Sequence, residues 1–240
     1  ELIPADDFRK ALADVLRRDN INALGYGDRA GYPPLRATIA HILADQGILT
    51  QPDHILVTTG SQQALSLTAS LLLRPGDRVI VESPTYPSMI DVFYSLGVEV
   101  IGIPMDENGM LVEKLEEILS AQKPTLIYTI PTYQNPTGIS MSGPRRRKLL
   151  ALAAQYDVPI LEDEFVGDLH YDGHLQPALK ALDQEGRVIY SGTFSKMLMP
   201  GLRLGYIVAD GPVYDRLVEW KMVTDLGTSD LMQRALEAYI

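Results

Sequence analysis

The segment SGTFSK at residues 191–196 places Lys196 just after a short apolar run that we expect to form a strand. A lysine amine at the end of a buried strand can lose its proton by desolvation and attack a carbonyl carbon. Shortly afterwards, Arg203 lies between two leucines behind a Pro-Gly turn, where it could clamp an anion. Each residue alone is also explained as a surface cation, so the interpretation depends on the residues that accompany them.

The segment TGSQQ at residues 59–63 places Ser61 and Gln62 between a predicted strand and a predicted helix. Free backbone N–H groups and the helix dipole favour an anion such as phosphate at a helix N-terminus. A simpler alternative is that Ser61 only caps the helix.

Three more side chains follow predicted strands, at the edge of an α/β sheet where ligand sites form. Asp163 would supply a carboxylate there, unless the acids around it form a solvated loop. Asn135 would supply an amide, unless the Asn-Pro pair only starts a turn. Tyr86 could stack on a flat ring, unless it packs on the surface at the entrance of a helix.

These groups are more informative together than singly. A lysine, a helix N-terminus suited to phosphate, an arginine, a carboxylate, an amide and an aromatic ring can together hold a flat, phosphorylated pyridine aldehyde. That description fits pyridoxal 5'-phosphate. The chain has no cysteine, which excludes disulfides, thiol nucleophiles and Cys-ligated zinc, and we expect no metal site.

The composition of the 240 residues, with 46% hydrophobic and 22% charged residues, is that of a folded chain. The net charge of −10 argues against nucleic-acid binding through this segment. The sequence begins without a signal-peptide pattern and contains no apolar run of membrane-spanning length, so we expect no membrane contact and a cytoplasmic location. An unfinished helical pattern at its end suggests a piece of a longer chain.

Short β-rich runs alternate with longer amphipathic runs, which predicts a three-layer α/β/α fold with a mostly parallel sheet. We expect strands at residues 55–58, 78–82, 99–103, 125–129, 159–162, 188–191 and 205–209. We expect helices at residues 5–18, 34–46, 61–73, 86–96, 112–121, 142–156, 212–223 and 229–240. We assign residues 1–47 to an N-terminal arm and helices, and residues 48–240 to one cofactor-binding large domain.

Several motifs resemble those of the fold-type I aminotransferase superfamily of class I/II, and they recur in the family's order. They are YGDRAGYPPLR at 26–36, TGSQQAL at 59–65, NPTG at 135–138, GTFSK at 192–196 and GLRLGY at 201–206. LHYDG at 169–173 and RVIYSGTFSK at 187–196 look most like the aminotransferase-like domain of MocR/GntR-type transcriptional regulators. The resemblance implies a pyridoxal-phosphate-dependent transferase large domain whose C-terminal small domain is missing.

The resemblance also implies roles for individual residues. Lys196 would form a Schiff base with the cofactor and then shuttle protons. Asp163 would pair with the pyridine nitrogen, Tyr86 would stack on the ring, and Asn135 would hydrogen-bond the phenolic oxygen. The phosphate would be bound by Ser61, Gln62, Ser195 and Arg203, with Thr193 as a possible helper. Tyr26 would reach the phosphate of a neighbouring subunit, which implies a homodimer.

Two sequence features depart from, or lie outside, this pattern. Phe165 stands where the family places a tyrosine near the phenolic oxygen, so the reactivity at this point differs from the family's. The basic run at residues 145–148, Arg145 and Arg146 included, is interpreted as a solvated helix face.

The implied function is an aminotransferase that converts an α-amino acid and a 2-oxo acid through a Schiff base on Lys196. An alternative is a domain that senses the cofactor and an effector in a MocR/GntR-type regulator with little turnover. A third interpretation is a β-eliminating or decarboxylating enzyme of the same fold. The sequence does not indicate which side chain the substrate carries.

Overall fold

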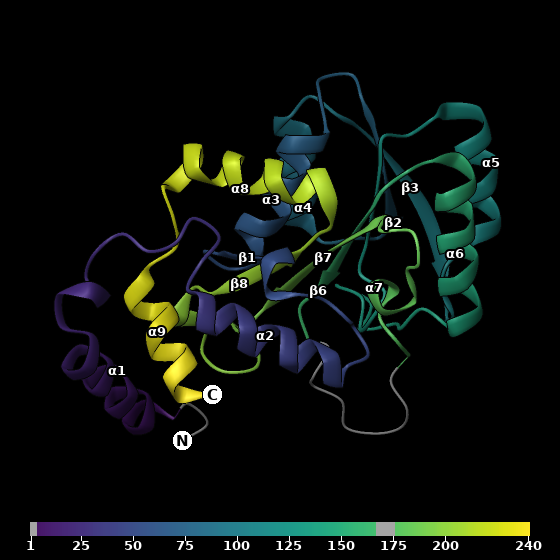
Figure 1. The fold of residues 1–240 in the computed structure, drawn as a ribbon. Helices are drawn as coiled ribbons and strands as arrows, with labels where there is room; N and C mark the ends of the chain where they lie inside the picture. The colour runs from purple at the N-terminus through teal and green to yellow at the C-terminus, as the bar shows by residue number, and fades with distance from the viewer. Residues whose placement is uncertain (1–3, 167–175) are drawn as a thin grey trace.

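The computed structural model describes residues 4–166 and 176–240. Its centre is an eight-stranded sheet with the strand order β1-β8-β7-β6-β5-β2-β3-β4 (Figure 1). The strands are β1 Ile55–Thr58, β2 Arg78–Ser83, β3 Glu99–Asp106, β4 Gly109–Met110, β5 Leu126–Thr129, β6 Ile160–Glu164, β7 Val188–Thr193 and β8 Gly205–Val208. Their alternation with helices confirms the predicted α/β class.

The sheet is parallel from β3 through β2, β5 and β6 to β7, and β8 is antiparallel to both β7 and β1. A parallel neighbour needs a crossover connection, usually a helix, whereas β7 and β8 are joined by a short segment of a turn and a 3₁₀ helix, Pro200–Leu202. This antiparallel return brings the start of β8 back beside the end of β7. The residues between the two strands, Lys196 and Arg203 among them, therefore stay at one edge of the sheet.

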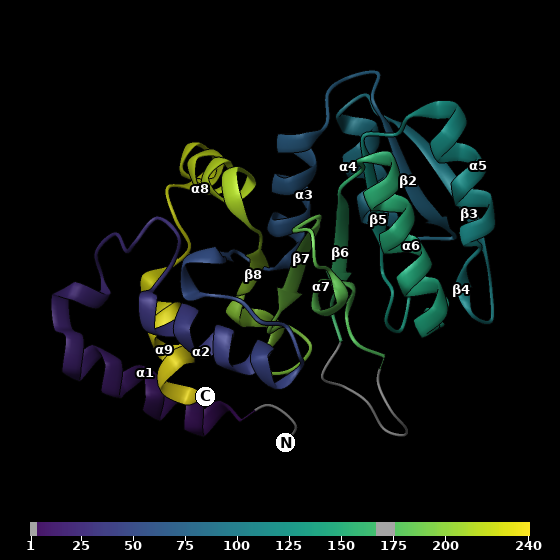
Figure 2. The same ribbon diagram turned by 45° about the vertical axis from the view of Figure 1, so that its right-hand side comes forward.

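Helices cover both faces of the sheet (Figure 2). They are α1 Ala5–Asp19, α2 Pro33–Asp45, α3 Ser61–Leu72, α4 Pro87–Ser95, α5 Val112–Gln122, α6 Gly143–Tyr156, α7 Leu179–Leu182, α8 Gly211–Asp225 and α9 Asp230–Tyr239. Apolar side chains of α3, α4 and α8 pack on one face, while those of α5 and α6, and of α2 and α9, pack on the other. Three layers result, as the sequence predicts.

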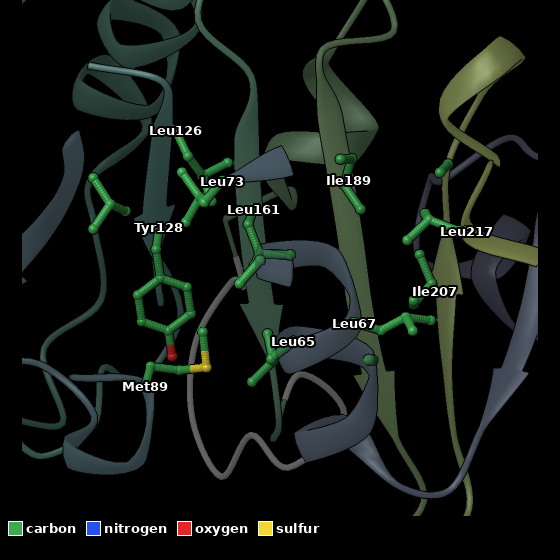
Figure 3. Close-up of a cluster of buried hydrophobic side chains, with 14 of the residues drawn as sticks. Leu65, Leu67, Leu73, Met89, Leu126, Tyr128, Leu161, Ile189, Ile207 and Leu217 are labelled. Atoms are coloured by element: carbon green, nitrogen blue, oxygen red, sulfur yellow. The ribbon is translucent and has the colours of Figure 1, made fainter. Parts of the chain in front are cut away.

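The first apolar cluster lies between the sheet and helices α3, α4 and α8 (Figure 3). Leu65 and Leu67 of α3 meet Leu161, Ile189 and other strand residues in it, all of them almost inaccessible to solvent. Removal of this apolar surface from water is the main force that fixes α3 on the sheet. The N-terminus of α3 is thereby held beside the ends of the central strands.

The structure differs from the predicted boundaries where acids and hydroxyl residues continue a strand. β6 extends to Glu164 and β7 to Thr193, because their ladder partners run in register, Asp163 beside Ser191 and Glu164 beside Gly192. Neither α7 nor β4 was predicted, since each has only a few residues and no periodic pattern. The LHYDG segment at 169–173 lies outside the described residues. No helix within residues 4–166 and 176–240 is long and apolar enough to cross a membrane.

Candidate functional site

A cavity of about 280 Å³ opens at the carboxyl ends of β6 and β7, against the N-terminus of α3. Its lining includes nine of the ten residues that the sequence singles out, everything except Tyr26. These nine are Ser61, Gln62, Tyr86, Asn135, Asp163, Thr193, Ser195, Lys196 and Arg203. Leu65, Phe165 and Pro200 complete the wall. Segments that are far apart in the sequence therefore meet in one place.

Asp163 lies within β6 and is only 4% exposed. Its Oδ2 accepts a hydrogen bond of 2.8 Å from the Tyr128 hydroxyl, whereas its buried Oδ1 has no partner among the described residues. Burial raises the pKa of Asp163 to about 6, and the bond from Tyr128 opposes that rise. A buried oxygen without a donor is costly, so Oδ1 is suited to a ligand that brings an N–H group.

The start of α3 forms a narrow cradle beside Arg203. The N-cap residue Gly60 has φ of +80°, and no side chain among residues 4–166 and 176–240 caps the helix. A Cβ on Gly60 would lie 2.7 Å from Nη2 of Arg203, and a Cβ on Gly205 would lie 2.8 Å from the backbone nitrogen of Ser61. Only glycine allows these close approaches. The first helical N–H groups and a guanidinium thus meet at one point, as an anion site requires.

Arg203 itself adopts the left-handed conformation, with φ of +51°. This conformation is uncommon for a residue with a side chain, and such residues gather at functional sites. The side chain is exposed and makes no hydrogen bond or ion pair with another described residue. Its charge is therefore available to a ligand.

Lys196 follows β7 in a turn that Thr193 stabilises. The hydroxyl of Thr193 accepts a hydrogen bond of 3.1 Å from the backbone N–H of Ser195. Lys196 is exposed, so the structure does not show the desolvation that the sequence suggested for this amine. The reason is that Lys196 lies beyond the strand, at the open cavity, and not within the sheet.

Tyr86 and Asn135 reach the cavity from two neighbouring loops. Tyr86 is the N-cap residue of α4, and its hydroxyl donates a hydrogen bond of 3.3 Å to Oε1 of Gln62. Asn135 follows Gln134, a buried side chain that sequence reasoning missed. The amide nitrogen of Gln134 donates to the carbonyl oxygen of Pro84 at 2.8 Å, and its oxygen accepts from Thr137. Gln134 thus ties the Asn135 loop to the Tyr86 loop.

The acids beside Asp163 are buried, so the alternative of a solvated acidic loop is wrong. Burial raises the pKa of Glu162 to about 7 and that of Glu164 to about 8. Glu162 accepts hydrogen bonds from the backbone nitrogens of Leu179 and Lys180, at 2.7 and 2.8 Å. Glu162 therefore anchors α7 to the sheet.

The prediction of a solvated helix face holds for Arg147 and Lys148, which are exposed, and is wrong for Arg145 and Arg146. Arg146 is fully buried and donates to the carbonyl oxygens of Met141, Pro131 and Pro177. Arg145 binds Asp106 with both of its terminal nitrogens. Both arginines are structural, because α6 packs against loops whose carbonyl and carboxylate oxygens need donors.

Tyr26 lies away from the cavity. It is 91% exposed and lines a separate hollow with Leu24, Leu226 and Thr228. The described part of the chain therefore does not bring Tyr26 to the other nine residues.

Tyr128 is the second residue that the sequence did not reveal. It lies within a buried apolar strand, where an aromatic residue is ordinarily a core residue. Nothing in the spacing showed that its hydroxyl reaches Asp163, because that contact joins two strands.

The fold and the cavity define an α/β protein with a cavity at the carboxyl ends of parallel strands, where α/β proteins commonly bind small molecules. The chain belongs to the aminotransferase class I and II family, which it matches over residues 1–240. This confirms the resemblance seen in the motifs.

Known proteins of two kinds are similar to the chain. It is 40% identical to an aromatic-amino-acid aminotransferase of Thermococcus litoralis, over 100% of the chain and 59% of that protein. It is 37% identical to an uncharacterized HTH-type transcriptional regulator of Bacillus subtilis, over 98% of the chain and 48% of that protein. The structure of kynurenine aminotransferase from Pyrococcus horikoshii, in complex with PMP, is similar with a TM-score of 0.95 at 40% identity, over 100% of the chain and 60% of that structure. The chain thus spans about half to three-fifths of these relatives.

Proposed function

We propose that this chain binds pyridoxal 5'-phosphate and acts in the transamination of an α-amino acid and a 2-oxo acid. One observation carries the proposal. A single cavity combines the amine of Lys196, the unpartnered buried Oδ1 of Asp163 and the guanidinium of Arg203 beside the start of α3. Family membership and a relative solved with PMP support the same cofactor.

The residues present fit this cofactor. Oδ1 of Asp163 lacks a donor, and the pyridine ring supplies one when its nitrogen is protonated. Gly60 and Gly205 carry no side chain and leave backbone N–H groups beside Arg203. Ser61, Gln62, Ser195 and Arg203, with help from Thr193, would hold the phosphate. When bound, the cofactor would supply an electron sink for the substrate carbon.

Each remaining residue would bind, orient or move a proton. Lys196 would hold the aldehyde carbon through Nζ and, once the substrate amine displaces it, accept the proton from the substrate Cα. Tyr86 would stack on the ring, and Asn135 would donate to the phenolic oxygen. Phe165, which lines the cavity without a hydroxyl, would leave that oxygen with one donor fewer than the family pattern provides.

We also propose that the protein is a cytoplasmic homodimer in which Tyr26 reaches the phosphate bound by the partner subunit. We propose in addition that residues 1–47 form an N-terminal arm and helices and that residues 48–240 form the large domain. The exposure of Tyr26 supports the dimer, since a tyrosine that is 91% exposed is available to a second chain.

Absorption spectroscopy tests the function. Pyridoxal phosphate added to the protein should give a visible band that saturates at one cofactor per chain. A panel of α-amino acids should then convert that band to the pyridoxamine form with release of a 2-oxo acid. Lys196→Ala should abolish the conversion, whereas Lys114→Ala, at an exposed lysine of α5, should leave it intact. Conversion at the wild-type rate by Lys196→Ala would refute the assignment.

A second candidate is an effector-sensing domain, favoured by the 37% identity to an HTH-type regulator. In that case the protein would bind cofactor and an amino acid, and the spectrum would change without release of any 2-oxo acid. Release of a 2-oxo acid at catalytic rates would decide for the enzyme. The net charge of −10 supports the view that DNA contact in such a regulator would come from another segment.

A further inference from the structure

The Tyr128 ring is held rigidly on β5. It has no exposed surface, and it packs edge to face on Phe93 of α4 with ring centroids 5.9 Å apart. Figure 3 shows the ring inside the apolar cluster between the sheet and α3 and α4. A ring packed in this way has little rotamer freedom, so its hydroxyl occupies a defined position.

That hydroxyl breaks the equivalence of the two Asp163 oxygens. It donates to Oδ2 at 2.8 Å, and no other described residue donates to either oxygen. The hydroxyl of Ser191, on the adjacent strand and directly opposite Asp163, is buried and makes no hydrogen bond with any residue that the structure describes. The carboxylate orientation therefore depends on Tyr128 alone within the described part of the chain.

The same contact favours the charged carboxylate. Burial raises the pKa of Asp163, and the bond from Tyr128 is the influence that lowers it. The titratable groups that interact electrostatically with this pair are Glu82 on β2, Glu164 on β6 and Tyr86 at the start of α4. None of these is a cation that could replace the stabilising bond.

We propose that Tyr128 is a positioning residue that turns Oδ1 of Asp163 toward the cavity and keeps the carboxylate ionised for the ring nitrogen of the cofactor. The proposal rests on the proposed cofactor function. Unlike a cationic partner, a phenol stabilises the anion without neutralising it, so the full negative charge remains available to a protonated ring.

Tyr128→Phe removes the hydroxyl and keeps the ring. The matched control is Thr68→Val on α3, which loses one buried hydrogen bond, from Thr68 Oγ1 to the carbonyl oxygen of Ala64 at 2.8 Å. The Asp163 carboxyl is titrated by ¹³C NMR in the cofactor-free protein, with Asp163→Asn to assign its signal. Pyridoxal phosphate affinity is measured separately, and thermal unfolding confirms that each variant folds.

In Tyr128→Phe, the titration midpoint of Asp163 should move upward and cofactor affinity should fall about threefold to tenfold, the net worth of one hydrogen bond. In Thr68→Val neither quantity should change. An unchanged midpoint in Tyr128→Phe, or an equal loss of affinity in the control, would overturn the role of Tyr128. If the wild type binds no pyridoxal phosphate, the proposed function fails first and the role assigned to Tyr128 fails with it.

Discussion

Asp163 should make the cofactor-free protein less stable near neutral pH. Its pKa of about 6 in the folded state lies above the unfolded value of 3.8. Between these values the folded state keeps a proton that the unfolded chain has released, so stability falls as pH rises from about 4 to about 6 and stays lower above that range. Such a cost is expected where a buried group awaits a ligand.

Asp163→Asn should remove this penalty. The variant keeps an acceptor for the Tyr128 hydroxyl, and it should exceed the wild type by about 2–3 kcal/mol in free energy of unfolding at pH 8, with a much smaller difference near pH 4. Urea unfolding of both cofactor-free proteins at the two pH values measures the effect. A gain that is the same at both pH values would contradict the ionisation argument.

Arg203 gives a second prediction for a single side chain. Arg203→Ala should weaken pyridoxal phosphate binding by about 1.5–3 kcal/mol, because a charge-assisted contact to phosphate is lost. Arg216→Ala, at an exposed arginine on α8, serves as the control and should bind normally. Affinity measured by spectroscopic titration decides the matter. If both variants bind pyridoxal phosphate with equal affinity, Arg203 is a surface cation and does not bind the phosphate.

At the scale of elements, all strands except β4 and all long helices could be predicted, because the strands are short apolar runs and the helices are longer amphipathic ones. The short helix α7 could not be predicted, because it is held by a contact distant in the sequence. Glu162 on β6 accepts hydrogen bonds from the first two backbone N–H groups of the helix. The burial of Arg146 had no local signal either, since its acceptors are carbonyl groups of two separate loops, one before α6 and one before α7. The nine cavity residues were identifiable because each lies near the end of a predicted strand or the start of a predicted helix. Tyr128 and Gln134 contact residues of other elements, and no local sequence pattern predicts such contacts.

The link between α8 and α3 yields a prediction at the same scale. Lys221 of α8 is fully buried and pairs with Asp225 at 2.7 Å, and Asp225 also accepts a bond of 2.6 Å from Gln63. Gln63 in turn accepts from the backbone N–H of Thr59, just before the cradle at Gly60. This chain of contacts should hold the start of α3 in place.

Asp225→Ala should cost about 3–5 kcal/mol in free energy of unfolding, because it leaves the Lys221 ammonium buried without a partner. Lys221→Met should cost clearly less, since it removes the charge and keeps an apolar chain of similar size. Chemical denaturation compares the two variants. If Lys221→Met proves as damaging as Asp225→Ala, the ammonium is not the group that needs compensation.

At the scale of the whole molecule, the exposed apolar side chains Ile21, Leu24 and Tyr26 lie on the segment after α1, and Leu226 joins Leu24 and Tyr26 around one hollow. Burial of these side chains by a second copy would offset the repulsion between two chains of charge −10. We expect the wild type to sediment as the proposed dimer and Leu24→Glu to sediment as a monomer in analytical ultracentrifugation. The control is Leu49→Glu, at a leucine that is 88% exposed and does not line this hollow. Dissociation by both variants, or by neither, would place the interface elsewhere.

The central claim is that Lys196 holds pyridoxal phosphate in the cavity, and covalent trapping tests it most directly. The protein is incubated with the cofactor, reduced with sodium borohydride, digested and mapped by mass spectrometry. We predict one reduced cofactor per chain, on the peptide that contains Lys196, and none in Lys196→Ala. A reduced cofactor on Lys180 or Lys221 instead, or an adduct that persists in Lys196→Ala, would contradict the account.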